Sequence, residues 1–142
     1  MTPRNTRRMK RRHVLKAAAG FGVSALAVQS GERRASAQGS SRTFVLIHGA
    51  WHGGWCWGPV AGNLRAQGHK VYAPSLSGLA DRSHLLSTSI TLDTHIADIV
   101  NLFQWEEIEN AVLVGHSYGG WPISGAAERL VGKIASIVYV DA

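Results

Sequence analysis

The feature that most constrains the fold is the segment 115–119 (GHSYG), which directly follows the apolar run 111–114 (AVLV). It matches the pattern G-x-S-x-G, in which a strand ends in a sharp turn, a serine sits at the apex and a helix begins. Gly115 and Gly119 are small enough to let strand and helix approach closely. The helix start directs unpaired N–H groups and a positive dipole end toward Ser117. The pattern predicts a nucleophilic serine; the alternative is a glycine-rich structural turn.

The groups that would activate this serine are unevenly placed along the chain. In hydrolases with such a turn, an Asp or Glu and then a His follow the serine. After Ser117 the chain offers Glu128 and Asp141 but no histidine, because all seven histidines precede it. The general base that would take the Ser117 proton is therefore missing from these 142 residues. We expect the N-terminal half of a longer enzyme, or a truncated product, that is inactive as given.

The first 37 residues are predicted to be an export signal. A basic segment over 7–16 precedes a mildly apolar stretch over 17–28, and 35–37 (ASA) is an A-x-A cleavage signal. Arg11 and Arg12 resemble the pair of a bacterial twin-arginine signal. The alternative is a disordered basic arm that binds nucleic acid, and the apolar stretch is too short for a spanning helix. We expect contact with the export machinery and a periplasmic or secreted protein.

Composition changes once this signal is set aside. The whole chain has a net charge of +6, but the remaining domain, 38–142, has six Lys and Arg against eight Asp and Glu, a net charge of −2. No basic patch remains to argue for nucleic acid or acidic substrates. Cys56 is the only cysteine, so no intramolecular disulfide can form. We interpret it as buried packing rather than as a nucleophile.

The domain is predicted to alternate strands and helices. Apolar, β-rich runs predict strands, and helical spacing or a following Gly predicts helices. The order implies a parallel sheet with right-handed crossovers, and residues 75–89 are predicted to be a loop. The expected strands are 43–47, 70–73, 110–114 and 136–140, and the expected helices are 57–67, 92–103 and 121–131.

Four segments carry a family resemblance. They are 44–57 (FVLIHGAWHGGWCW), 78–84 (GLADRSH), the turn around Ser117, and 138–142 (VYVDA). Together they resemble the α/β-hydrolase group of small bacterial esterases, plant methylesterases and hydroxynitrile lyases. The resemblance implies an α/β fold with a doubly wound, mostly parallel sheet, truncated after the strand that follows the Ser117 turn. Residues 38–142 would then be the N-terminal half of such a domain.

The resemblance also suggests how the site is built. It implies that the backbone N–H of Ala50, together with that of Tyr118 after the serine, forms an oxyanion hole. Two such donors are worth on the order of 3 kcal/mol each. Trp51 and Trp121 are candidates for the wall of a substrate pocket, and His48 is expected to orient its loop rather than transfer protons. No metal and no cofactor is expected.

Other polar residues are given structural roles. His116 is expected to pack away from the substrate. His84, Asp81 and Arg82 are interpreted as a loop hydrogen-bond network rather than a metal site. His95, beside Asp93, is expected at a solvated helix start. Asp141 is interpreted as structural, with a catalytic acid as the alternative.

These observations favour a serine carboxylesterase that acts on a small-molecule, apolar ester. A hydroxynitrile lyase is the alternative with the same fold, but the family pattern of those enzymes has Thr where this chain has Gly49. A non-catalytic exported fragment is the alternative from another class.

Overall fold

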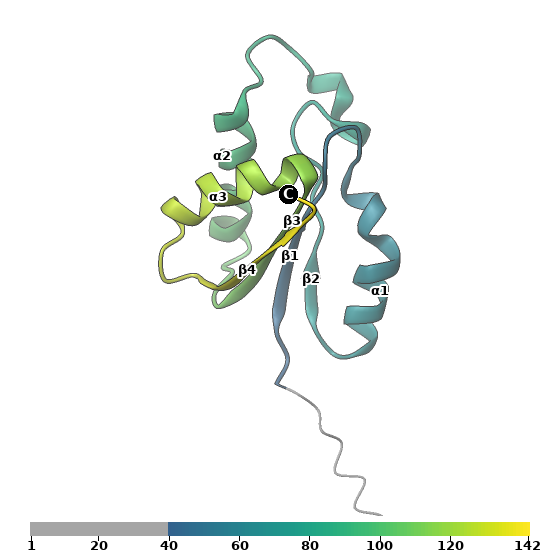
Figure 1. Cartoon of the computed structure of the whole chain (residues 1–142), viewed down its shortest axis with the longest axis vertical. Helices are drawn as coiled ribbons and strands as arrows, with labels where there is room; N and C mark the ends of the chain where they lie inside the picture. The colour runs from purple at the N-terminus through teal and green to yellow at the C-terminus, as the bar shows by residue number, and fades with distance from the viewer. Residues whose placement is uncertain (1–39) are drawn as a thin grey trace, which may run out of the picture. The chain divides into compact units, whose positions relative to one another are not determined.

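The computed structural model describes residues 40–142, so the predicted signal peptide lies outside the described residues. Four parallel strands form one sheet in the spatial order β2-β1-β3-β4 (Figure 1). The strands are β1 (Thr43–Ile47), β2 (Lys70–Tyr72), β3 (Ala111–His116) and β4 (Ile134–Val140), and the helices are α1 (Gly58–Ala66), α2 (Leu92–Trp105) and α3 (Gly120–Arg129). The predicted alternation of strands and helices is confirmed.

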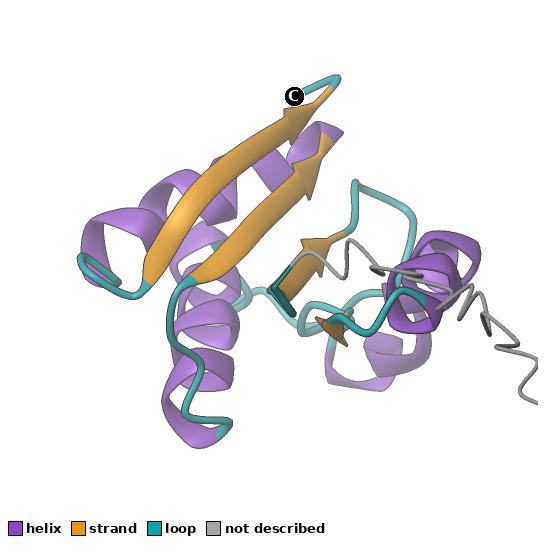
Figure 2. Ribbon diagram, turned by 90° about the horizontal axis from the view of Figure 1, so that it is seen from below, coloured by secondary structure: helices purple, strands orange, loops and turns teal. Residues whose placement is uncertain are grey.

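The centre of the sheet is built from its most apolar strands. Most residues of β1 and β3 are buried, because helices cover both faces of this part of the sheet (Figure 2). The two strands pair in register from Thr43 with Ala111 to Ile47 with Gly115. Their carboxyl ends therefore lie side by side, and the segments that follow them meet at one edge of the sheet.

Each face of the sheet has its own core. On one face, α2 and α3 pack side chains such as Ile99, Phe103 and Ile123 against β1 and β3. On the other face, α1 packs Ala61 against a smaller cluster that includes Leu46 and Val112. This arrangement confirms the predicted doubly wound, parallel α/β fold.

Strand β4 forms one edge of the described sheet, and six of its seven residues are exposed. Its register with β3 places Val138 beside Val114, on the face that α1 covers elsewhere. Val138 and Val140 are 42% and 40% exposed. The part of the sheet within residues 40–142 thus has an exposed apolar edge at β4.

Several boundaries differ from the prediction. The helix expected over 57–67 is α1, Gly58–Ala66, which has a proline in its first turn and is preceded by a 3-10 turn, Gly54–Trp57. The predicted loop over 75–89 contains a further 3-10 turn, Ala80–Leu85. Cys56, expected to be buried, is half-buried, and this partial burial raises the pKa of its thiol. Among residues 40–142, no helix is both long and apolar enough to cross a bilayer.

Candidate active site

The turn after β3 has the strand–turn–helix geometry that the sequence predicts. Ser117 opens a single 3-10 turn, Ser117–Gly119, and α3 begins at the next residue. Its φ of +49° lies in the left-handed region, which a residue with a side chain rarely adopts. Backbone strain of this kind concentrates at functional sites.

Small residues are required around this turn because backbone atoms approach each other closely. A Cβ on Gly119 would lie 2.8 Å from both the Ile47 and the His48 carbonyl oxygens. A Cβ on Gly115 would lie 2.7 Å from the Gly119 carbonyl oxygen. The turn is therefore packed directly against the end of β1, where the predicted oxyanion loop begins.

His48 connects the predicted oxyanion loop after β1 to the segment after β2 by hydrogen bonds. Its ring is fully buried, and the Leu76 backbone N–H donates to Nε2 at 3.0 Å. Because Nε2 accepts, the proton of the neutral ring is on Nδ1, which donates to the Gly49 carbonyl oxygen at 2.8 Å. Burial lowers the pKa of His48 and favours this neutral form.

The loop after β1 also touches the serine turn. A Cβ on Gly49 would lie 2.9 Å from His116 Nδ1 and 3.2 Å from Ser117 Cβ. The His116 ring is half-buried and meets the Trp57 ring edge to face, with centroids 6.5 Å apart. These contacts give His116 a packing role, as expected.

A small hollow brings the two predicted oxyanion residues together. Its volume is about 180 Å³, and it is lined by Ala50, Trp51, Leu79, His95 and Tyr118. It lies at the carboxyl ends of β1 and β3, the end where parallel α/β sheets bind ligands. Of the two predicted wall residues, Trp51 lines the hollow, whereas Trp121 does not and contacts the Tyr118 ring at a centroid distance of 6.1 Å.

Tryptophans at positions 51, 55, 57 and 121 are expected from their apolar character to be mostly core and pocket wall, and a core position is wrong for three of them. Trp51, Trp55 and Trp121 are 92%, 65% and 69% exposed. Trp51 also has a positive φ of +66°, and it lies within the turn that the His52 N–H closes on the Gly49 carbonyl oxygen at 3.4 Å. Periodicity does not reveal such a conformation.

The expectation that His95 lies at a solvated helix start is also wrong. His95 is 6% exposed and lies one and two helical turns before the buried Ile99 and Phe103. Asp93 does face outward, where its carboxylate pairs with Arg129 at 2.8 Å. The spacing of 95, 99 and 103 was the signal that could have placed His95 inward.

A polar network secures the segment after β2. The Gly54 N–H donates to Ser75 Oγ at 2.8 Å, and that hydroxyl donates to Asp81, lowering the pKa of its carboxyl. Arg82 donates to the Ser75 carbonyl oxygen at 3.1 Å. Asp81 and Arg82 thus belong to a loop network, whereas His84 is exposed. In residues 40–142 no group of three or more His, Cys, Asp or Glu could hold a metal.

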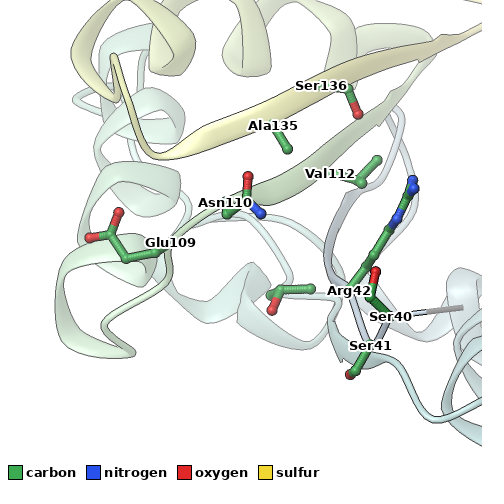
Figure 3. A pocket seen from close by; sticks show the side chains of 9 residues that line it. Ser40, Ser41, Arg42, Glu109, Asn110, Val112, Ala135 and Ser136 are labelled. Atoms are coloured by element: carbon green, nitrogen blue, oxygen red, sulfur yellow. The ribbon is translucent and has the colours of Figure 1, made fainter.

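A larger hollow lies at the opposite end of the sheet. It has a volume of about 450 Å³ and lies at the amino ends of β1, β3 and β4, between Arg42, Asn110 and Ser136 (Figure 3). Ser117 follows the carboxyl end of β3, so this hollow is remote from it. Size alone therefore does not locate the candidate site.

Fold and site together define an α/β hydrolase. The sequence model of the alpha/beta hydrolase family matches residues 44–142, and the chain belongs to this family. The chain is 50% identical over 99 residues to a carbendazim hydrolyzing esterase from Nocardioides sp. (strain SG-4G), covering 70% of this chain and 41% of that protein. It is 40% identical over 102 residues to methyl jasmonate esterase 1 from Vitis vinifera, covering 71% and 39%.

Solved structures agree with this assignment. An extracellular alpha/beta-hydrolase from a Paenibacillus species superposes with a TM-score of 0.64 at 31% identity, covering 69% of this chain and 39% of that one. Polyneuridine aldehyde esterase gives a TM-score of 0.64 at 31% identity, covering 70% and 39%. The chain thus spans about two fifths of the length of these relatives.

Proposed function

We propose that this chain supplies the nucleophile and the oxyanion hole of an esterase. The observation that carries the proposal is the strained conformation of Ser117 at the apex of a turn packed against the loop of Ala50. Ser117 Oγ attacks the ester carbonyl carbon, and the N–H groups of Ala50 and Tyr118 stabilise the oxyanion. The alcohol leaves with the serine proton, and water then hydrolyses the acyl-enzyme.

The proton transfers require a general base. Since no histidine follows Ser117 in the sequence, we propose that a histidine beyond residue 142 serves this role in the full-length protein, with an acid that orients it. Without that base a serine hydroxyl stays close to its unactivated reactivity. Residues 38–142 alone are therefore expected to show no Ser117-dependent turnover.

The substrate is proposed to be a small, apolar carboxylic ester. Relatives named as a carbendazim hydrolyzing esterase and a methyl jasmonate esterase support ester cleavage. The lyase alternative is not better supported, because the chain has Gly49 where the lyase pattern has Thr, and the relatives named above are esterases. We therefore propose hydrolysis rather than cyanohydrin cleavage.

The test is hydrolysis of p-nitrophenyl acetate by the full-length protein. Ser117→Ala is expected to lower kcat by about 10³-fold or more. Ser124→Ala, which removes a hydroxyl bonded within α3 to the Gly120 carbonyl oxygen, serves as the matched control and should retain activity. Equal rates for wild type and Ser117→Ala would refute the proposed nucleophile, and turnover by 38–142 would point to an upstream histidine.

Export through the twin-arginine pathway is a separate proposal that rests on residues 1–37. A reporter fused to residues 1–40, active only after folded export, is expected outside the cytoplasm. Arg11→Lys combined with Arg12→Lys should abolish this export. Normal export of the double variant would exclude the twin-arginine assignment.

A further inference from the structure

The Tyr118 side chain is held by a hydrogen bond whose direction the geometry determines. His95 Nε2 lies 2.9 Å from the Ser77 carbonyl oxygen, which can only accept, so Nε2 carries the proton. Nδ1 of the neutral ring is then an acceptor, and the Tyr118 hydroxyl donates to it at 2.7 Å. Burial raises the pKa of Tyr118, which keeps the phenol protonated as this bond requires.

A second residue of α2 stabilises the hydrogen bond between His95 and Tyr118 indirectly, through Ser77. Asp98 lies one helical turn after His95 and accepts two hydrogen bonds from Ser77, from its N–H at 2.7 Å and from its hydroxyl at 2.9 Å. Ser77 is thus fixed by both residues, and its carbonyl oxygen in turn fixes the His95 ring. The His95 and Tyr118 rings meet edge to face with an interplanar angle of 87°.

The held ring forms one wall of the hollow beside the candidate oxyanion donors. Tyr118 and His95 line it together with Ala50, Trp51 and Leu79, and its volume of about 180 Å³ suits a small group. The backbone N–H of Tyr118 is one proposed oxyanion donor, so the same residue would bind the reacting carbonyl and border the adjoining group. A shift of this ring would change the shape of the hollow, because the ring is part of its lining.

We infer that His95 is a positioning residue that holds Tyr118 as a fixed wall and thereby restricts the hollow to the smaller apolar group of the ester. This inference rests on the proposed esterase function. The size of the hollow is thus restricted from α2, by a residue that acts through Tyr118 and has no part in the proposed chemistry. It makes His95 a determinant of chain-length selectivity rather than of the chemical step.

The test compares short and long esters in the full-length protein. The measured quantity is the ratio of kcat/KM between acetate and hexanoate p-nitrophenyl esters, and between methyl and hexyl esters of one acid. Tyr118→Phe, which removes only the hydroxyl, and His95→Ala are expected to lower the short-to-long ratio about three- to tenfold in one of the two series, the fold-change that corresponds to one neutral hydrogen bond. His95→Gln, which can still accept from Tyr118, should restore much of the ratio.

Tyr72→Phe is the matched control, because the Tyr72 hydroxyl donates to Glu106 at 3.1 Å away from the hollow. It should leave both ratios unchanged. A purely structural role for the His95 contact would lower the rates for all esters equally. Unchanged ratios in Tyr118→Phe and His95→Ala, in both series, would overturn the inference.

A second readout separates this inference from the esterase proposal. In ¹⁵N spectra of histidine side chains, His95 should be the Nε2–H tautomer, and its Nδ1 resonance should shift in Tyr118→Phe but not in Tyr72→Phe. Absence of Ser117-dependent hydrolysis would refute the esterase function alone. An Nδ1 resonance that does not respond to Tyr118→Phe would refute the positioning contact, whatever the activity.

Discussion

At the scale of single residues, the site depends on backbone atoms that come close enough to exclude a side chain. A Cβ on Gly119 would meet two carbonyl oxygens at the end of β1, and backbone cannot move aside as a flexible side chain can. The position of Ser117 relative to the Ala50 loop therefore depends on residues that carry no functional group. Mutations that add one methyl group at these positions test this dependence.

Gly119→Ala is expected to destabilise the protein by about 1–3 kcal/mol, since its Cβ would lie 2.8 Å from two carbonyl oxygens. Urea unfolding of the full-length protein measures the change. Gly62→Ala is the control: a Cβ there meets nothing within 4 Å, and in the middle of α1 it should add about 0.5–1 kcal/mol of stability. Equal effects of the two substitutions would contradict the close packing.

His48 predicts a pH dependence of stability. Its folded pKa is lowered from 6.5, so between that lowered value and 6.5 the unfolded chain binds more protons than the folded one. Stability then rises with pH across this window, and the His48 contribution is complete above 6.5 and is lost as pH falls below it. Urea unfolding at pH 7.5 and 5.5 should show lower stability at pH 5.5.

His48→Gln keeps an acceptor and a donor without titrating. It should reduce the difference between the two pH values, even where it lowers stability at both. The lowered pKa of Asp81 acts only below its ordinary value of 3.8, where stability is lost as pH falls, so it does not contribute in this window. A pH dependence identical to wild type would show that another group is responsible.

At the scale of elements, α2 both packs against α3 and reaches the candidate site. Gly125 of α3 provides the space for this packing: a Cβ there would overlap Ile96 Cδ1 and lie 3.0 Å from Ile96 Cγ1. The neighbouring residue of α2, His95, is hydrogen-bonded to the Tyr118 hydroxyl. Helix α2 thus contributes Ile96 to the contact with α3 and His95 to the lining of the hollow.

Gly125→Val is expected to destabilise the full-length protein by about 1–3 kcal/mol through overpacking against Ile96. Combining it with Ile96→Ala should recover part of this loss, a coupling of about 0.5–3 kcal/mol in a double-mutant cycle measured by urea unfolding. Gly62→Val, the same change on the open face of α1, is the control. Additive effects of the two substitutions would argue against direct contact.

The elements show what the sequence could and could not predict. Apolar runs and the G-x-S-x-G spacing were enough for the strand order along the chain, the parallel sheet and the turn at Ser117, because these depend on local patterns. The burial of His95 and the outward Trp51 were missed. His95 has the helical spacing of the buried Ile99 and Phe103, but a polar residue is not counted in an apolar pattern, so its burial was not predicted. The exposure of Trp51 depends on a positive φ, which leaves no mark in hydrophobic periodicity.

At the scale of the whole molecule, the described sheet has one exposed apolar edge. An exposed edge strand is a template for pairing with another chain, so isolated 38–142 is expected to aggregate. Val138→Lys in that segment should lower aggregation, measured by light scattering over a range of concentrations. Val131→Lys is the control, because Val131 is 84% exposed but lies between α3 and β4, outside the sheet. A monodisperse, cooperatively folding 38–142 would contradict the prediction.

The spatial order β2-β1-β3-β4 also determines when each strand can find its neighbours during translation. Strand β1 can pair with β2 as soon as Tyr72 is available, but its second neighbour does not begin until Ala111. At about 5–20 residues per second, translation of the intervening segment takes a few seconds. During that interval the strand destined for the middle of the sheet has one unpaired side on the nascent chain. Of the two inner strands of the described sheet, β1 therefore waits longer for its second partner than β3 does, although its central position protects it once the sheet is complete.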